Sequence, residues 1–215
     1  MRPCATTLES ELSVNEQKCL TTHLKNSGYT GKHLEIGTAA GGTLWQMLSV
    51  FEEGQTPPFV VIDPMSYFPD QFEKVQENLR AHDCDPQAVD FRITDSAIAY
   101  AAAYDAKERF DFMLIDGNHK LRYVTEDLRW AGLLNVGGIV CLHDYYRVHI
   151  DVMIAADDFL KRNPNYKLVE LCDTLLVIRK ESESTKPEVG AFNIMKAQLM
   201  TPFMQLRRSI LKRFK

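Results

Sequence analysis

Short β-prone runs alternate with helix-prone stretches along most of this chain, and this alternation limits its fold more than any other feature. The runs that follow one another from His33 onward are HLEIGT, FVVIDP, VDFRITD, FDFMLIDG and GGIVCLHD. Each precedes a stretch with helical character, near residues 43–51, 70–81, 97–107, 120–133 and 148–162 in turn. Such alternation predicts a parallel sheet with helices on both of its faces.

Two further strand-like runs, YKLVELC and TLLVIRK, close the series and meet at Asp173 and Thr174. No helix fits between them, so we expect them to form an antiparallel hairpin at one edge of the sheet. The predicted fold is therefore α/β and Rossmann-like, with a mostly parallel seven-stranded sheet, helices on both faces and a terminal antiparallel hairpin.

The composition divides the chain into four parts. Residues 1–30 form an N-terminal helical segment for which we predict no chemistry, and residues 8–27 of it present one apolar face. The leucines of that face are Leu8, Leu12, Leu20 and Leu24. Residues 31–180 form the domain proper. Residues 181–190 have the polar, proline- and glycine-containing composition of a linker, and residues 191–215 form a C-terminal tail.

The C-terminal tail has the pattern of a basic amphipathic helix. Its apolar residues recur every three or four positions, at Phe192, Met195, Leu199, Phe203, Leu206, Ile210 and Phe214. Thr201 and Pro202 interrupt this stripe, and a threonine N-cap followed by proline predicts that a second helix starts there. The tail has no acidic residue, and its basic residues are Lys196, Arg207, Arg208, Lys212, Arg213 and Lys215. We expect it to pack on a partner subunit of a homodimer or to lie on an anionic membrane surface, the alternative being a helix folded back onto its own domain.

Charge and composition exclude several classes of protein. The formal net charge is −4 although the tail is basic, so the rest of the chain is strongly acidic, which argues against nucleic acid as a partner. No stretch approaches the roughly 20 apolar residues of a membrane-spanning helix, and residues 1–7 lack the pattern of a signal peptide. The 5 cysteines are scattered without a C-x-x-C pair, so we interpret them as reduced structural thiols. We therefore expect a cytoplasmic protein, with peripheral membrane contact through its tail.

Residues that directly follow the predicted strands carry the chemistry, because open parallel sheets bind ligands beyond the carboxyl ends of their strands. The first strand leads into a loop of small residues from Glu35 to Thr43, which either approaches a cofactor closely or makes only a tight turn. Its spacing is not the G-x-G-x-x-G of dinucleotide-binding loops. Asp63 follows the second strand, where a carboxylate can accept hydrogen bonds from both ribose hydroxyls or simply form a turn. Asp95 and Ser96 follow the third strand and either cap the next helix or contact an adenine.

The fourth and fifth strands end in the most polar segments of the series. Asp116 and His119 follow the fourth strand, and His143 and Asp144 follow the fifth. Adjacent strand ends would bring two carboxylates and two imidazoles to one edge of the sheet. A convergence from two strands favours a functional site over isolated structural histidines.

Together, these motifs resemble those of methyltransferase family 24. This is a group of class I S-adenosylmethionine (SAM)-dependent enzymes related to catechol- and macrolide-sugar-type O-methyltransferases. The resemblance covers about residues 30–180 and rests on LEIGTAAGGT, VVIDP, FDFMLIDGNHKLRYVTEDL and GGIVCLHDYY. Its most specific part is I-D-G-x-H-x-x-x-x-V-x-x-D-L followed by G-G-x-x-x-x-H-D. Tyr123 departs from this pattern, since it lies one residue later than the aromatic residue of the family.

The resemblance implies a cofactor site and a metal site. Glu35, Gly37, Thr38, Gly41 and Gly42 would surround the methionine part of SAM, Asp63 would hold the ribose, Asp95 and Ser96 would lie near the adenine, and Asp116 would border the cofactor. Asp116 and Asp144 match positions where metal-dependent relatives bind a divalent ion, and oxygen ligands suit magnesium or calcium. Where relatives often have a further Asn or Asp ligand, this chain has Tyr145. His143 could serve instead and would favour manganese or zinc.

The resemblance further implies O-methylation of a hydroxyl on a small molecule or sugar. His119 is the expected general base, three residues after Asp116, and Asp144 and His143 would act beside it. Two alternatives stay open. Asp63 would equally serve an NAD-dependent oxidoreductase, and the basic tail would suit a non-catalytic SAM-binding or scaffold protein.

Overall fold

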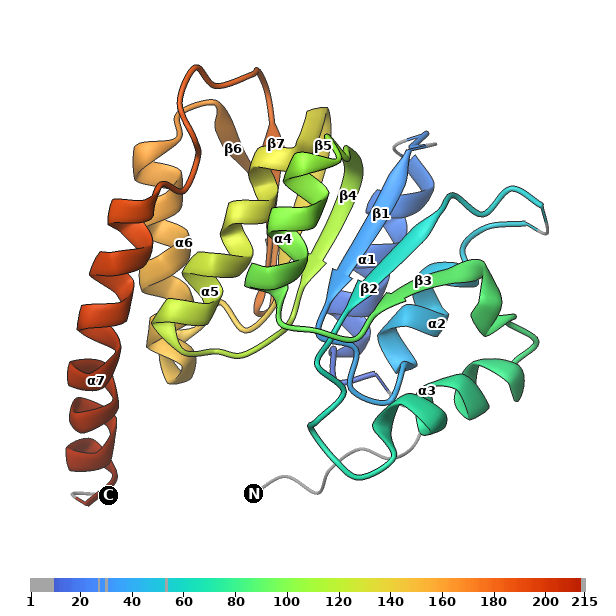
Figure 1. The fold of residues 1–215 in the computed structure, drawn as a ribbon, viewed down its shortest axis with the longest axis horizontal. Helices are drawn as coiled ribbons and strands as arrows, with labels where there is room; N and C mark the ends of the chain where they lie inside the picture. The colour runs from blue at the N-terminus through green and yellow to red at the C-terminus, as the bar shows by residue number, and fades with distance from the viewer. Residues whose placement is uncertain (1–9, 27, 30, 53, 214–215) are drawn as a thin grey trace.

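The computed structural model describes residues 10–26, 28–29, 31–52 and 54–213, which form one α/β sandwich (Figure 1). Its sheet has the strand order β3-β2-β1-β4-β5-β7-β6. The strands are β1 (Lys32–Ile36), β2 (Phe59–Ile62), β3 (Val89–Arg92), β4 (Phe110–Ile115), β5 (Leu134–Leu142), β6 (Tyr166–Cys172) and β7 (Leu175–Lys180). The strands from β1 to β5 pair in parallel, and β7 pairs antiparallel with both β5 and β6. The predicted fold class and terminal hairpin are confirmed.

Helices cover both faces of the sheet because the strands alternate apolar side chains between two cores. On β2, Val61 belongs to the core under the first helices of the chain, and Ile62 belongs to the core on the opposite face. The first face is covered by α1 (Val14–Asn26), α2 (Gly42–Leu48) and α3 (Gln71–Arg80). The second is covered by α4 (Ser96–Asp105), α5 (Leu121–Asp127), α6 (Ile150–Arg162) and the start of α7 (Ala191–Arg213). Short 3₁₀ segments lie at Pro86–Ala88, Leu128–Leu133 and Arg147–His149. Thus the helix predicted over 120–133 is α-helical only to Asp127.

The first helix starts later than the apolar pattern predicts. It begins at Val14 because Ser13 and Glu16 form a capping box: the Ser13 amide donates to Glu16 Oε2 (2.7 Å), and the Glu16 amide donates to Ser13 Oγ (3.2 Å). Leu12, Leu20 and Leu24 are buried as predicted, whereas Leu8 lies outside the described residues.

The last helix runs without a break through Pro202, so the prediction of a second helix starting there is wrong. Thr201 does not act as an N-cap. Its hydroxyl donates to the Ala197 carbonyl within the helix (2.7 Å) and accepts from the Arg122 amide of α5 (3.1 Å). Ala197, Thr201 and Met204 are buried, and α7 packs along α5. This packing holds the helix together across a proline that would otherwise favour a break.

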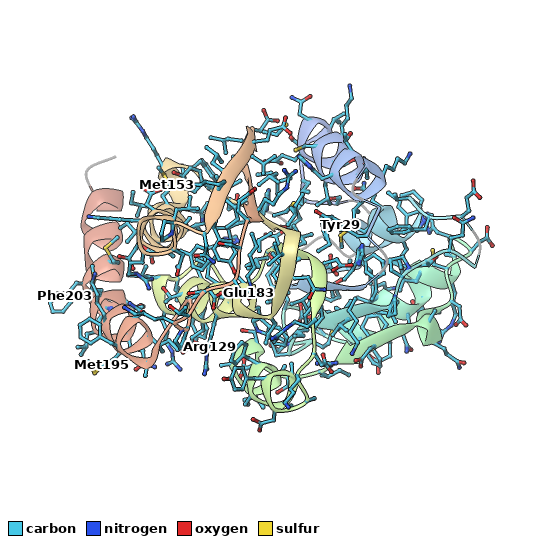
Figure 2. All side chains as sticks on the ribbon, turned by 90° about the horizontal axis from the view of Figure 1, so that it is seen from above. Tyr29, Arg129, Met153, Glu183, Met195 and Phe203 are labelled. Atoms are coloured by element: carbon cyan, nitrogen blue, oxygen red, sulfur yellow. The ribbon has the colours of Figure 1, made fainter. Side chains whose placement is uncertain are left out.

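The opposite side of α7 is apolar and faces away from the protein. Phe192, Met195, Leu199 and Phe203 are between 50 and 73% exposed. Figure 2 shows Met195 and Phe203 pointing outward at one end of the molecule. Residues 191–204 therefore fold back onto their own domain while leaving an outward apolar stripe. Within the described part of the chain, no helix is both long enough and apolar enough to span a membrane.

Candidate active site

A pocket of about 840 Å³ lies at the carboxyl ends of β1, β2, β3 and β4. This is where an open parallel sheet binds its ligands. Most of the site residues predicted from the sequence contribute to its lining: Gly37, Thr38, Gly42, Asp63, Asp95, Ser96, Asp116 and His119. Glu35, Gly41, His143 and Asp144 are not among its lining residues but adjoin it, as described below.

The glycine of the first loop is required by the sheet itself. Gly37 has a φ of 84°, and a Cβ there would lie 2.3 Å from the Asp116 carbonyl oxygen, because the ends of β1 and β4 nearly touch. A side chain is therefore excluded with or without a ligand. Gly41 has a φ of 87° and precedes α2 as its N-cap, so it shapes the turn rather than the pocket surface.

Asp63 holds the loop in place. Its carboxylate accepts hydrogen bonds from the Thr38 amide (3.0 Å) and the Met65 amide (2.7 Å). The Thr38 hydroxyl is 
buried in the pocket lining and has no hydrogen-bond partner among the described residues. Since buried polar groups are nearly always paired, this hydroxyl is a group that a bound ligand would satisfy.

Glu35 lies at the base of the pocket and is fully buried. Neither of its carboxylate oxygens has a hydrogen-bond partner within the described residues. Burial, with the nearby charges of Asp116 and Asp63, outweighs the lowering effect of the neighbouring Thr38 hydroxyl and raises the pKa of Glu35 to about 8. A positively charged ligand group close to Glu35 would favour the ionised carboxylate, so the electrostatics at this end of the pocket suit a cation.

Asp95 and Ser96 begin α4 at the far side of the pocket. Asp95 occupies the N-cap position, but its side chain makes no capping hydrogen bond, so the capping alternative is wrong for this residue. The Ser96 hydroxyl donates to Asp127 of α5. Burial raises the pKa of Asp127 to about 7. Asp95 and Ser96 both line the pocket.

A chain of acidic and imidazole groups starts at Asp116 and runs away from the pocket. His143 Nδ1 lies 2.9 Å from Asp116 Oδ1, and His143 Nε2 lies 3.5 Å from Glu16 Oε2. Glu16 comes from α1 and also accepts from the amide and the hydroxyl of Thr174 (2.8 and 2.6 Å). Both nitrogens of His143 thus face carboxylates. The Asp116 hydrogen bond and the three carboxylate charges outweigh burial and raise the pKa of His143 to about 9.

His119 extends this chain to the mouth of the pocket. Its Nε2 lies 3.3 Å from Asp144 Oδ2 and 3.6 Å from Asp116 Oδ1. His149 stacks edge-on against His119, with ring centroids 4.5 Å apart, and its Nε2 lies 3.6 Å from Asp144 Oδ2. The two carboxylates outweigh burial and raise the pKa of His119. Burial would raise the pKa of Asp116, but His119 and His143 hold it well below its usual range.

The same groups satisfy the spatial requirement for a cation site. Ligand atoms of Asp116, His143 and Asp144 lie within 4.8 Å of one another, as do those of His119, Asp144 and His149. The structure therefore brings the predicted metal ligands together. It adds His149, which the sequence reasoning left aside although it lies only six residues after His143.

Sequence reasoning missed two more residues at the site, Glu16 and Arg122, and left the role of Tyr123 open. Glu16 lies in the segment for which no chemistry was predicted, and its partners His143 and Thr174 are far away in sequence. Arg122 and Tyr123 line the pocket with their side chains close together, the guanidinium lying 5.4 Å from the ring centre. The position of Tyr123, which departs from the family pattern, therefore still places it at the pocket.

Comparison with known proteins places this site in a family. The model of methyltransferase family 24, described as a methyltransferase domain, matches residues 34–145. No curated protein matches the chain. The match covers the loop after β1 and the ends of β2, β3, β4 and β5, which are the segments that build the site.

Solved structures share the fold at low sequence identity. An O-methyltransferase from Bacillus cereus, solved with S-adenosylhomocysteine (SAH), is 15% identical with a TM-score of 0.63, over 79% of this chain and 83% of the other. TomG from Streptomyces achromogenes, an O-methyltransferase of tomaymycin synthesis solved with SAM, is 15% identical with a TM-score of 0.61, over 80% and 82%. CalS11, a TDP-rhamnose 3′-O-methyltransferase of calicheamicin biosynthesis, is 16% identical with a TM-score of 0.61, over 76% of each chain. Because the family model matches more than half of the chain and its segments build the pocket, this protein belongs to the methyltransferase family 24.

Proposed function

We propose that this protein is a SAM-dependent O-methyltransferase acting on a hydroxyl of a small molecule or sugar. The observation that carries the proposal is the pocket itself, which joins a loop with unsatisfied buried polar groups to a histidine held between two carboxylates. The SAM- and SAH-bound O-methyltransferases that share the fold support the choice of cofactor. The family match removes the reason to favour an NAD-dependent oxidoreductase.

The residues present fit SAM along the length of the pocket. Thr38 offers an unpaired hydroxyl where the charged methionine part would lie, with the buried carboxyl of Glu35 nearby, and Gly37 and Gly42 leave room for backbone contacts of the ligand. Asp63 retains acceptor capacity for ribose hydroxyls beyond its two amide contacts. Asp95 and Ser96 lie where the adenine would end.

The proton of the acceptor hydroxyl would pass to His119. In methyl transfer, the acceptor oxygen forms a bond to the methyl carbon as the bond from that carbon to sulfur breaks, and the hydroxyl proton must leave. His119 lines the pocket and is partly exposed, and Asp116 and Asp144 strengthen it as a base once it is neutral. Alignment of the reacting atoms supplies much of the remaining acceleration.

His143 is better suited to positioning than to proton transfer. Both of its nitrogens face carboxylates, and its raised pKa favours the cationic form, which has no lone pair for a metal. We assign it the role of holding Asp116. A divalent metal, magnesium or manganese, would then be held by the carboxylates of Asp116 and Asp144, with His143 as a ligand only after it loses a proton. Such a metal would orient the acceptor hydroxyl and lower its pKa.

The side chains around the pocket mouth suit a compact hydroxylated acceptor. Tyr67, Arg122 and Tyr123 combine aromatic surface with a guanidinium, the mixture that binds sugars or phosphate-bearing small molecules. The nucleotide-sugar acceptor named for CalS11 supports this class. Nucleic acid remains an unfavourable partner, because the body of the protein is acidic.

Calorimetry followed by methyl transfer tests this proposal. We expect SAM and SAH to bind and NADH not to bind, and radiolabelled methyl groups to appear on hydroxylated small molecules or nucleotide sugars. Binding of SAM without transfer to any of them would support the non-catalytic alternative. Binding of NADH in place of SAM would refute the proposal.

We further propose that α7 lies on an anionic membrane surface of the cytoplasm. Its outward stripe of Phe192, Met195, Leu199 and Phe203 is exposed, and the sequence that follows is basic without any acidic residue. Removal of residues 205–215 leaves the buried contacts of Ala197, Thr201 and Met204 with the domain intact. We expect the wild-type protein to sediment with phosphatidylserine vesicles but not with neutral vesicles. This truncation and Phe203→Ser should each reduce the fraction that sediments with phosphatidylserine vesicles. The wild-type protein could instead bind neither kind of vesicle and form a dimer that Phe203→Ser abolishes. That result would identify this face as a subunit interface.

A further inference from the structure

A second cluster of metal-ligating groups lies between α1 and β6, outside the pocket. Cys19 and His23 are four residues apart and share one face of α1. Glu170 and Cys172 are two residues apart and share one face of β6. The helix lies against this edge strand, so two pairs of side chains, far apart in the sequence, meet at one place.

Distances within the cluster match those of a tetrahedral zinc site. Cys19 Sγ lies 3.5 Å from Glu170 Oε2, and His23 Nε2 lies 3.1 Å from the same oxygen. Ligand atoms of Cys19, His23 and Glu170 all lie within 4.8 Å of one another. Zinc–ligand bonds of roughly 2.0–2.3 Å would separate nitrogen from oxygen by about 3.4 Å and sulfur from oxygen by about 3.6 Å.

Cys172, on the same face of β6 as Glu170, is the proposed fourth ligand, although its Sγ is not among the three ligand atoms that lie within 4.8 Å of one another. Its Sγ lies 3.5 Å from the Asn15 carbonyl oxygen, and Asn15 lies one turn before Cys19 on the same row of α1. Cys19 is buried, His23 and Cys172 are partly exposed, and the Glu170 side chain is 51% exposed. The cluster therefore has one buried ligand and a side open to solvent through which a metal can enter.

We infer that Cys19, His23, Glu170 and Cys172 form a structural zinc site. Thiolate and imidazole ligands select zinc over magnesium, and a closed set of four protein ligands is typical of structural rather than catalytic zinc. On binding, each thiol that becomes a ligand releases its proton to solvent. The metal would fasten α1 to the sheet edge one turn after Glu16, the carboxylate that faces His143.

Cobalt titration of the reduced full-length protein tests the site separately from the pocket. Thiolate ligation gives Co²⁺ a strong near-ultraviolet charge-transfer band, which the cysteine-free cluster around Asp144 cannot produce. We expect one Co²⁺ per chain with this band, displaced by one equivalent of Zn²⁺, and a higher unfolding temperature when zinc is bound. The band should persist in Asp144→Asn and in Cys84→Ser, a matched cysteine control in the loop after α3.

Variants of the cluster decide the outcome. Cys19→Ser and Cys172→Ser should each lower the intensity of the band, since one thiolate remains, and should each weaken Co²⁺ binding at least tenfold. His23→Gln, at a partly exposed position, should weaken binding while the fold is retained. Absence of the band in the reduced wild type would overturn the inference. This includes the case in which the protein is isolated with a Cys19–Cys172 disulfide and binds no metal after the disulfide is reduced. If Cys19→Ser or folded His23→Gln bound Co²⁺ with wild-type affinity and a band of wild-type intensity, the inference would be overturned as well.

Discussion

Glu16 is predicted to connect the stability of the N-terminal helix to catalysis. Its buried carboxylate accepts from the Ser13 amide and from the amide and hydroxyl of Thr174, and it faces His143 Nε2. Burial opposes its ionisation, but the hydrogen bonds from Thr174 and Ser13 outweigh burial and lower its pKa. Hydrogen bonds to charged groups contribute about 1.5–3 kcal/mol each. Glu16→Gln keeps one acceptor oxygen but turns an amide toward the remaining donors, so we expect a loss of roughly 1.5–3 kcal/mol in the free energy of unfolding.

The effect on turnover separates positioning from simple stability. Without the Glu16 carboxylate, His143 loses one of the two groups that orient it and holds Asp116 less firmly. If Asp116 and Asp144 hold a metal, loss of such an outer partner typically costs about 10–100-fold in metal affinity or activity. Urea unfolding gives the stability, and kcat measured well below the unfolding transition gives the catalytic effect. Glu73→Gln, in the exposed first turn of α3, is the matched control and should change neither. A Glu16→Gln protein with wild-type stability and wild-type kcat would refute this account of α1.

Three further predictions address the pocket. Asp63→Ala should weaken SAM binding in calorimetry by about 1.5–3 kcal/mol per charged hydrogen bond lost. Unchanged affinity in a folded variant would remove Asp63 from the cofactor site. The pKa of Glu35 is raised from 4.5 to about 8 in the folded state, so Glu35 ionises at lower pH in the unfolded chain. The free energy of unfolding should therefore fall as pH rises between those values, by up to about 1.4 kcal/mol per pH unit. Glu35→Gln should reduce the pH dependence of the free energy of unfolding measured in urea. An unchanged pH dependence would contradict the raised pKa of Glu35. Asp144→Asn should reduce turnover, and if a metal acts there, a chelator should do the same to the wild type. Loss of activity in Asp144→Asn without any effect of the chelator would assign the carboxylate a direct role, and full activity in both would exclude Asp144 from catalysis.

The sheet and the pocket lining were predictable because strand ends in a parallel sheet meet at one edge. Alternation of β-prone and helix-prone stretches predicts the mostly parallel sheet, the two closing strand-like runs predict the hairpin, and the strand ends with the family motifs select Asp63, Asp116 and His119. Helix limits were less predictable, since they depend on local capping. The Ser13–Glu16 capping box was present in the sequence and would have placed the start of α1 at Val14.

Long-range partners could not be read from the sequence. Glu16 meets Thr174 and His143 only after the hairpin returns to the sheet edge, and the same return brings Cys172 against the row of α1 that carries Asn15 and Cys19. Widely spaced cysteines without a C-x-x-C pair gave no signal of this cluster. The unbroken α7 depends on burial of its inner face against α5, a tertiary contact that overrides the local preference of Pro202 for a helix start.

The rate of methyl transfer in His119→Ala tests the central claim most directly. With an acceptor that the wild type methylates, single-turnover kinetics give the chemical step and calorimetry gives SAM affinity. The account predicts a rate about 10²–10⁴-fold lower, with SAM affinity nearly unchanged, because His119 meets the acceptor hydroxyl rather than the cofactor. His82→Ala, at an exposed position beside α3, should retain the wild-type rate. A wild-type rate in His119→Ala would contradict the assignment of His119 as the general base.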